Sequence, residues 1–183
     1  MRKLFLQLLV SVDGYFDGPN QELDWFVVDD EFLAYVDAML GSIDGILLGR
    51  TTYEGFAAHW PHSTQAEAAG MNTLPKFVAS TTLSNATWSN TTIIADDVPN
   101  AVARMKQEPG KDLAIFGSSI LASTLAAHGL IDEYRFFVVP VLLGRGKRFL
   151  DGLPDRLDLT LQQTRVSGSG VVAHYYTPTG AMA

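Results

Sequence analysis

Two short segments of the sequence run from an apolar stretch through a glycine into residues with hydroxyl side chains. The first is residues 46–54, with Gly49 at the junction, and the second is residues 114–121, with Gly117 at the junction. This pattern is typical of a buried strand followed by a helix. The first N–H groups of a helix have no partner within the helix, and glycine lets an anion approach the backbone closely. Each junction could therefore bind a phosphate group.

Polar side chains after the two glycines favour the same chemistry. Arg50 carries a permanent positive charge and is followed by Thr51 and Thr52, while Ser118 and Ser119 follow the second glycine. Taken alone, either junction could be an ordinary connection in which the hydroxyl caps the helix. Because parallel strands end at the same edge of a sheet, we expect the two helix starts to lie together, where a dinucleotide would bind.

Other motifs that could carry chemistry are incomplete. His59 and His62 are separated by Pro61, which interrupts helical geometry, and no third ligand is close in sequence, so we expect no metal site. The chain has no cysteine, which excludes disulfides, thiolate metal sites and a cysteine nucleophile. No glycine-rich dinucleotide fingerprint follows the first strand. A basic cluster at residues 145–148 is typical of solvated surface, although a phosphorylated substrate or the cofactor could use it.

Strands and helices alternate along most of the sequence. Short apolar runs predict strands at residues 4–12, 46–48, 76–79, 91–95 and 113–116. Helical periodicity predicts a helix from about Asp30 to Ile43 and further helices at residues 52–58, 99–107 and 118–127. Longer strands follow at residues 133–142, 157–166 and 171–177, and the last two flank a turn. This order predicts an α/β fold with a mixed, mostly parallel sheet of about eight strands, about four covering helices and a C-terminal antiparallel hairpin.

Length and charge limit the classes of function. The 183 residues suit a single domain, residues 1–183, with a frayed tail at 178–183. Thirteen basic against twenty acidic residues give a net charge of −7, which argues against a nucleic-acid partner. The longest apolar run, residues 136–143, is too short to cross a membrane. The N-terminus resembles a signal peptide but lacks a cleavage site, so we expect a cytoplasmic protein.

The ordered set of motifs resembles the dihydrofolate reductase superfamily. The sequence is most similar to the branch of the RibD C-terminal domain, the reductase domain of bacterial riboflavin biosynthesis. The matching segments are residues 11–15, 48–54, 77–80, 116–119, 129–133 and 140–146. They span about residues 4–176 in the expected order, and the resemblance implies a dihydrofolate-reductase-like fold. Ser118 is a departure, because dihydrofolate reductases have a second glycine there.

The resemblance also implies NADPH as the hydride donor. Two groups of residues, after Gly49 and after Gly117, would hold its phosphates, and a third group would lie beside the adenosine ribose. The implied cofactor-binding residues are Gly49, Arg50, Thr51, Thr52, Ser80, Thr81, Gly117, Ser118, Ser119, Ile120 and Leu121. Many relatives place an arginine next to the serine of the ribose group, whereas this chain has threonine at 81 and 82. NADH therefore stays open as the donor.

The catalytic acid implied by the resemblance is Asp30, which matches by its spacing after Trp25. Burial beside Trp25 and Phe26 would raise its pKa and so make it a useful proton donor. A plain helix cap, formed by Asp29 or Asp30, explains the same residues equally well. We further expect Asp13 and Trp25 to contact the substrate.

These expectations describe a reductase that transfers hydride to a C=N or C=O group of a small heterocyclic or sugar-derived substrate. The alternative is a non-catalytic nucleotide- or ligand-binding module that keeps the cofactor cleft. The resemblance also implies a homodimer. The apolar residues 136–139 could contribute to its interface or belong to the core.

Overall fold

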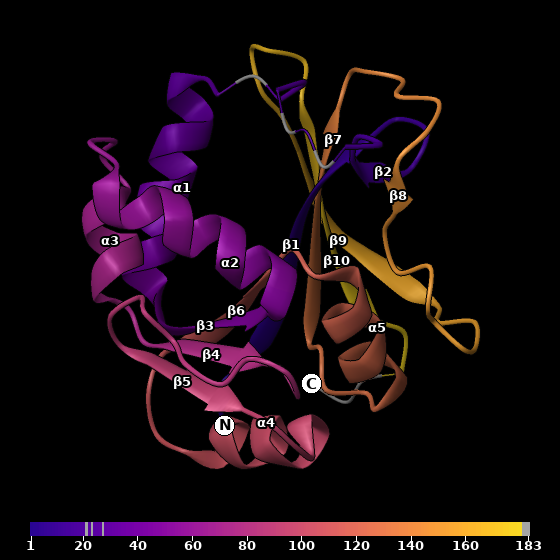
Figure 1. Ribbon diagram of the computed structural model, residues 1–183. Helices are drawn as coiled ribbons and strands as arrows, with labels where there is room; N and C mark the ends of the chain where they lie inside the picture. The colour runs from indigo at the N-terminus through magenta and orange to yellow at the C-terminus, as the bar shows by residue number, and fades with distance from the viewer. Residues whose placement is uncertain (21, 23, 27, 181–183) are drawn as a thin grey trace.

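One large sheet and one small sheet make up the strand content of the protein. The computed structural model describes residues 1–20, 22, 24–26 and 28–180. Its strands are β1 (Leu4–Ser11), β2 (Tyr15–Asp17), β3 (Ile43–Gly49), β4 (Lys76–Ala79), β5 (Thr91–Ile94), β6 (Asp112–Phe116), β7 (Glu133–Val139), β8 (Lys147–Arg148), β9 (Leu159–Val166) and β10 (Val172–Pro178). The large sheet has eight strands in the order β5-β4-β3-β6-β1-β7-β10-β9, and β2 pairs with β8 apart from it (Figure 1).

The pairing within the large sheet is mostly parallel. Strands β1, β3, β4, β5 and β6 run parallel to their neighbours, and β7 is parallel to β1, whereas β10 is antiparallel to both β7 and β9. This confirms the predicted α/β architecture with its C-terminal antiparallel hairpin. Parallel sheets need cover on both faces, because their connections pass over them.

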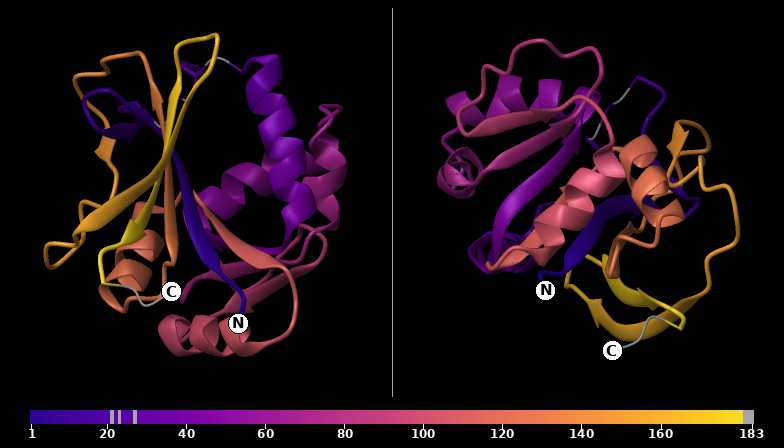
Figure 2. Two further views of the ribbon diagram at one scale, coloured as in Figure 1. Left: turned by 180° about the vertical axis from the view of Figure 1, so that it is seen from behind. Right: turned by 90° about the horizontal axis from the view of Figure 1, so that it is seen from below.

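Helices form a layer on each face of the sheet (Figures 1 and 2). They are α1 (Asp30–Ser42), α2 (Arg50–His59), the 3-10 helix η1 (Trp60–His62), α3 (Ala68–Thr73), α4 (Val98–Gln107) and α5 (Ser119–Ala127). Helices α1 to α3 pack with Phe5 of β1 on one face, whereas α4 and α5 pack with Leu4 and Leu6 on the other. The central strand β1 is therefore buried on both sides, which explains its nearly continuous apolar sequence.

Several predicted boundaries and elements need correction. Strand β3 begins at Ile43, which the sequence placed at the end of the preceding helix. The strand predicted over residues 133–142 ends at Val139, directly before Pro140, which cannot donate to a ladder. Short elements with weak sequence signals, namely β2, β8, η1 and α3, were not predicted. The apolar residues 136–139 lie in an interior strand whose Phe136, Phe137 and Val139 side chains are buried within the one chain.

The chain leaves two neighbouring strands in opposite directions. From β3 it passes through α2 and α3 to β4, and from β6 it passes through α5 to β7 on the other side of β1. Helices α2 and α5 therefore diverge onto opposite faces of the sheet. A crevice outside the carboxyl ends of such diverging strands is the usual binding place in open α/β sheets. In the described part of the chain, no helix is both long and apolar enough to cross a membrane.

Candidate functional site

The two glycine-marked junctions meet at the carboxyl edge of the sheet. Strands β3 and β6 are hydrogen-bonded neighbours, with Leu47 opposite Ile115, so both strands end side by side. A Cβ atom at Gly49 would overlap the Ser118 hydroxyl oxygen, and a Cβ atom at Gly117 would lie 3.1 Å from the Thr52 Oγ1 atom. Each glycine is thus in contact with the hydroxyl residue of the other junction. The structure brings together the two groups that the sequence predicted to face one edge.

The β6–α5 junction has an uncommon backbone. Gly117 and Ser118 have φ values of +60° and +57°, so two successive residues adopt the left-handed conformation. The conformation is easy for glycine but costs about 1–2 kcal/mol for a residue with a Cβ atom such as Ser118. Helix α5 consequently begins at Ser119, one residue later than predicted. Such backbone strain occurs preferentially at ligand-binding sites.

Helices α2 and α5, which begin at this edge, differ from α1 in whether a side chain hydrogen-bonds to the N–H groups of the first turn. Helix α1 has a protein cap, because the Asp29 carboxylate accepts a hydrogen bond from the Phe32 N–H group at 2.8 Å. At α2 and α5 the capping positions are Gly49 and Ser118, and neither makes a side-chain hydrogen bond to its helix. The N–H groups of two adjacent first turns, with the positive ends of two helix dipoles, can donate hydrogen bonds to the phosphates of a dinucleotide.

Arg50 supplies an exposed positive charge at the start of α2. Its side chain is 50% exposed and pairs with Glu54 one turn later, at 3.1 Å. An exposed pair of this kind contributes little to stability, so a phosphate can replace the carboxylate at small cost. Thr51 is exposed beside it, and Thr52 is partly buried against Gly117.

The residues predicted after Gly117 divide into two sets. The Ser119 side chain remains at the crevice, where its hydroxyl donates to the Arg148 carbonyl at 3.4 Å, and Ile120 is 84% exposed. Leu121, in contrast, is buried in the core beneath α5. Leu121 can therefore contribute only its backbone to an anion site.

Ser80 and Thr81 follow β4, the neighbour of β3, and so lie at the same edge of the sheet. The buried Ser80 hydroxyl accepts hydrogen bonds from the N–H groups of Thr82 and Leu83, at 3.2 and 2.9 Å. Its side chain fixes the turn after β4, whereas Thr81 is exposed. This arrangement leaves Thr81 as the accessible hydroxyl of the pair.

Asp13 is held firmly by the protein itself. Its carboxylate accepts hydrogen bonds from the Ser11 hydroxyl at 2.7 Å and from the N–H groups of Leu143 and Gly144 at 3.1 and 2.7 Å. The Ser11 bond above all, together with the two backbone bonds, lowers the pKa of Asp13 to about 2. The carboxylate therefore ties the turn after β1 to the loop after β7, and its predicted contact with substrate stays a prediction.

The lowered pKa of Asp13 makes the acid stability of the protein depend on this residue. Because the folded-state pKa of about 2 lies below the ordinary 3.8, its stabilisation is complete above pH 3.8 and is lost as the pH falls toward 2. We expect Asp13→Asn to lower the thermal unfolding midpoint at neutral pH. In this variant the midpoint should also fall less steeply between about pH 4 and pH 2. Asp37→Asn, at an exposed carboxylate of α1, is the control and should leave the profile unchanged. Parallel profiles for wild type and Asp13→Asn would contradict the assignment.

Of the two aspartates at the start of α1, Asp29 forms the helix cap that the sequence offered as the alternative, whereas Asp30 is not buried as expected. Asp29 is the N-cap of α1, and its pKa is lowered first by a hydrogen bond from the Ser169 hydroxyl and then by the capping bond. Asp30 is exposed at the first position of the helix, so the expected burial of this residue is wrong. Trp25 is partly buried and packs with Phe137, and its indole N–H donates to the Glu22 carbonyl at 3.0 Å.

The structure places one residue of the basic cluster at 145–148 beside the start of α5. Pairing of β2 with β8 brings Arg148 beside Ser119, and the Arg148 guanidinium lies 4.9 Å from the centre of the Tyr15 ring. The basic cluster at 145–148 was the available signal. Its position could not be inferred, because it depends on pairing between strands about 130 residues apart. In the part of the chain that the structure describes, no group of three metal-ligating side chains occurs.

Comparison with known proteins agrees with this geometry. The RibD C-terminal domain family matches residues 2–173. The uncharacterized protein YyaP of Bacillus subtilis is 32% identical over 180 residues, which cover 96% of this chain and 94% of YyaP.

Two solved structures illustrate the breadth of the fold. A putative riboflavin biosynthesis protein from Shewanella superposes with a TM-score of 0.78 at 19% identity, covering 97% of this chain and 99% of the other. Dihydrofolate reductase from Enterococcus faecalis, complexed with NADP(H), gives a TM-score of 0.65 at 12% identity, covering 97% and 96%. The fold is thus that of the dihydrofolate-reductase-like reductases. With the family match over nearly its whole length, the chain belongs to the RibD C-terminal domain family.

Proposed function

We propose that this chain is a cytoplasmic, NADPH-dependent reductase. It transfers hydride to a C=N or C=O group of a small substrate that is heterocyclic, such as a pteridine, or sugar-derived, such as a ribosylaminopyrimidine. The observation that carries the proposal is the pair of uncapped helix starts, at Gly49 and Ser118, in contact at the point where β3 and β6 diverge. Family membership and the dihydrofolate-reductase-like fold support it.

The crevice residues have distinct tasks in this proposal. The first turns of α2 and α5 bind the phosphates through backbone N–H groups, and Arg50 neutralises their charge. Ser119 and Thr52 add hydroxyl donors, and Thr81 lies on the side where the adenosine ribose would extend. When bound, the reduced nicotinamide supplies the hydride, and the protein contributes orientation and exclusion of water. NADPH differs from NADH by a third phosphate. Because no arginine stands next to Ser80, Arg50 is the main cation for that phosphate.

Binding is tested by fluorescence titration of the full chain with NADPH and NADH. Trp88 is buried and Trp60 partly buried in the core cluster that contains Tyr53 of α2, so their emission reports on this helix. We expect saturable quenching with NADPH and weaker binding of NADH. Absence of saturable quenching with either nucleotide would contradict the proposed site.

Asp30 remains the proposed proton donor, and its neighbour provides a matched control. Asp30→Asn should reduce turnover in NADPH oxidation with pteridine or ribosylaminopyrimidine substrates and leave NADPH affinity and the unfolding midpoint unchanged. Asp29→Asn keeps one oxygen for the cap, whereas Asp29→Ala removes the cap and should lower the unfolding midpoint. Unchanged turnover in Asp30→Asn would exclude this residue as the donor.

The second candidate function is a non-catalytic nucleotide- or ligand-binding module. It is favoured by the exposure of Asp30 and by the three hydrogen bonds that already occupy Asp13. NADPH binding without oxidation across the substrate panel would support the module. We also propose a homodimer, for which the exposed edge strand β9 offers unpaired backbone groups, and light scattering in solution would show its mass.

A further inference from the structure

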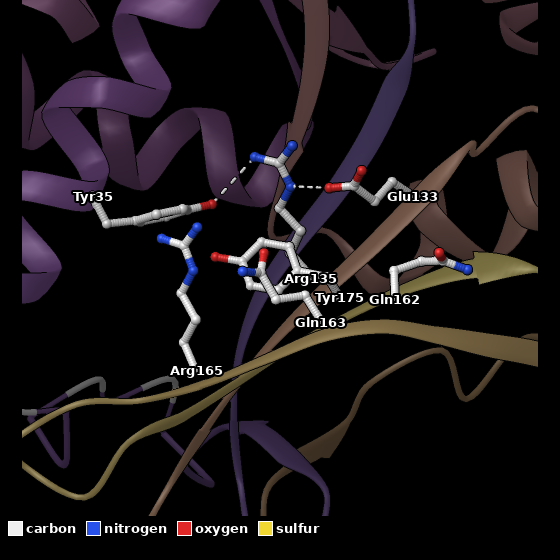
Figure 3. Close-up of a pocket in the computed structure, with 7 residues that line it drawn as sticks. All are labelled: Tyr35, Glu133, Arg135, Gln162, Gln163, Arg165 and Tyr175. Atoms are coloured by element: carbon white, nitrogen blue, oxygen red, sulfur yellow. Dashed lines mark hydrogen bonds and ion pairs between the residues drawn. The ribbon is translucent and has the colours of Figure 1, made fainter.

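A cavity lies away from the two glycine-marked junctions, between α1 and the antiparallel end of the sheet (Figure 3). It has a volume of about 500 Å³, within the range of small-molecule sites. The side chains that line it are polar or aromatic, namely Tyr35, Glu133, Arg135, Gln162, Gln163, Arg165 and Tyr175. A smaller cavity of about 150 Å³ shares Tyr35, Arg165 and Tyr175 and extends toward Asp29 and Glu31 at the start of α1.

Arg135 is held in place on the floor of the larger cavity. Its guanidinium pairs with Glu133 at 2.5 Å, stacks 3.6 Å from the centre of the Phe5 ring and donates to the Tyr35 hydroxyl at 3.3 Å. The Tyr35 hydroxyl in turn donates to the Gln7 side chain at 2.6 Å. These contacts orient both the guanidinium and the phenol before any ligand arrives, which lowers the entropic cost of binding.

Arg165 differs from Arg135 in its contacts. It extends from β9 toward Tyr35 and lies 5.9 Å from the centre of the Tyr175 ring (Figure 3). Within the described residues it has no ion pair and no hydrogen bond. Two arginines and one glutamate leave the cavity one net positive charge, in a chain whose net charge is −7. The smaller cavity adds two carboxylates: Asp29 caps α1, and Glu31 accepts a hydrogen bond from the Gly168 N–H group at 3.3 Å.

Strand β9, at the edge of the sheet, has a β-bulge beside the cavity. The pairing of β9 with β10 shifts between Tyr175 and Tyr176, because Tyr175 faces Gln163 and Tyr176 faces Leu161. Gln162 is the extra residue of this β-bulge, and both Gln162 and Gln163 consequently line the cavity. Bulges are frequent beside functional sites because they redirect a side chain. The Gln163 amide is thereby added to the groups that face the cavity, whereas the Gln162 amide donates to the Thr177 hydroxyl at 3.0 Å.

We propose that this cavity binds a small aromatic anion, a carboxylate or phosphate ester on an aromatic ring. The Arg165 guanidinium forms the charge-assisted, two-pronged contact that carboxylates and phosphates favour. The Tyr35 and Tyr175 rings contact the aromatic part, and the Gln163 amide binds a further polar group on it. The site is separate from the nucleotide crevice and does not depend on reductase activity.

The test is isothermal titration calorimetry on the full chain with benzoate, phenyl phosphate, inorganic phosphate and neutral benzamide. We expect saturable, one-to-one binding of benzoate or phenyl phosphate, and the tighter of the two identifies the acid group. Benzamide should bind at least about tenfold more weakly, because it lacks the charge. Inorganic phosphate should also bind more weakly, because it lacks the ring.

Variants at Arg165 show whether binding occurs in this cavity. Arg165→Gln should weaken binding of the preferred anion by about tenfold or more, and Arg165→Lys, which keeps the charge but not the planar fork, should have an intermediate effect. The control is Arg104→Gln, on an exposed arginine of α4 on the opposite face, which should bind as wild type does. NADPH titration of Arg165→Gln should be unchanged. No saturable binding of either aromatic anion, or wild-type affinity in Arg165→Gln, would overturn the proposal.

Discussion

Gly49→Ala is expected to destabilise the protein by about 1–3 kcal/mol and to lower its NADPH affinity by about two orders of magnitude. The added Cβ atom overlaps the Ser118 hydroxyl and would lie 2.9 Å from the Ser118 Cβ atom. Because Ser118 follows a left-handed glycine, relief of the overlap requires the β3–α2 and β6–α5 junctions to separate. Separation moves the two first turns away from the geometry that binds one pyrophosphate. Thermal unfolding and fluorescence titration measure the two effects.

The partner substitution provides an internal control for this overlap. Ser118→Gly removes both atoms that the new Cβ would meet and suits the positive φ at that position. Gly49→Ala combined with Ser118→Gly should therefore recover most of the lost stability and affinity. Gly55→Ala, at a helical glycine of α2 with open space around it, should not destabilise. If the double variant is as impaired as Gly49→Ala, contact between the two junctions is not the cause.

Arg50→Ala is expected to weaken NADPH binding at least about tenfold, because a charge-assisted contact to phosphate is lost. Stability should change little, since the exposed pair with Glu54 contributes about 0.3–0.5 kcal/mol at most. Higher salt should weaken wild-type binding more steeply than binding by the variant, because fewer charges remain to be screened.

Two controls separate the role of Arg50 from a general change in charge. Glu54→Gln releases Arg50 from its partner and should bind NADPH as well as or better than wild type. Arg104→Ala removes an equal charge from the opposite face and should have no effect. Unchanged NADPH affinity in Arg50→Ala would remove Arg50 from the site.

Local sequence signals predicted the parts of the site that depend on strand and helix ends. Gly49 and Gly117 each follow a short apolar run, so both junctions and their common edge could be inferred from parallel-sheet geometry alone. The alternation of strands and helices likewise predicted the parallel body and the antiparallel hairpin. These features arise from neighbours in sequence, which is why they were accessible.

Features built from distant contacts could not be predicted. Asp13 is bound by Leu143 and Gly144, about 130 residues away, and its spacing gave no sign of this structural role. Either Asp29 or Asp30 could have filled the capping position of α1. Asp29 takes it, and the exposure of Asp30 then depends on how α1 packs on the sheet. The charged cavity depends on the bulge at Gln162, which periodicity does not reveal.

The most direct test of the central claim is a crystal structure of the chain grown with NADPH. We predict density for the pyrophosphate between the first turns of α2 and α5, with phosphate oxygens within hydrogen-bond distance of the backbone after Gly49 and Gly117 and of the Arg50 guanidinium. Density for the nucleotide at another place on the protein, with these two junctions free of phosphate, would contradict the account.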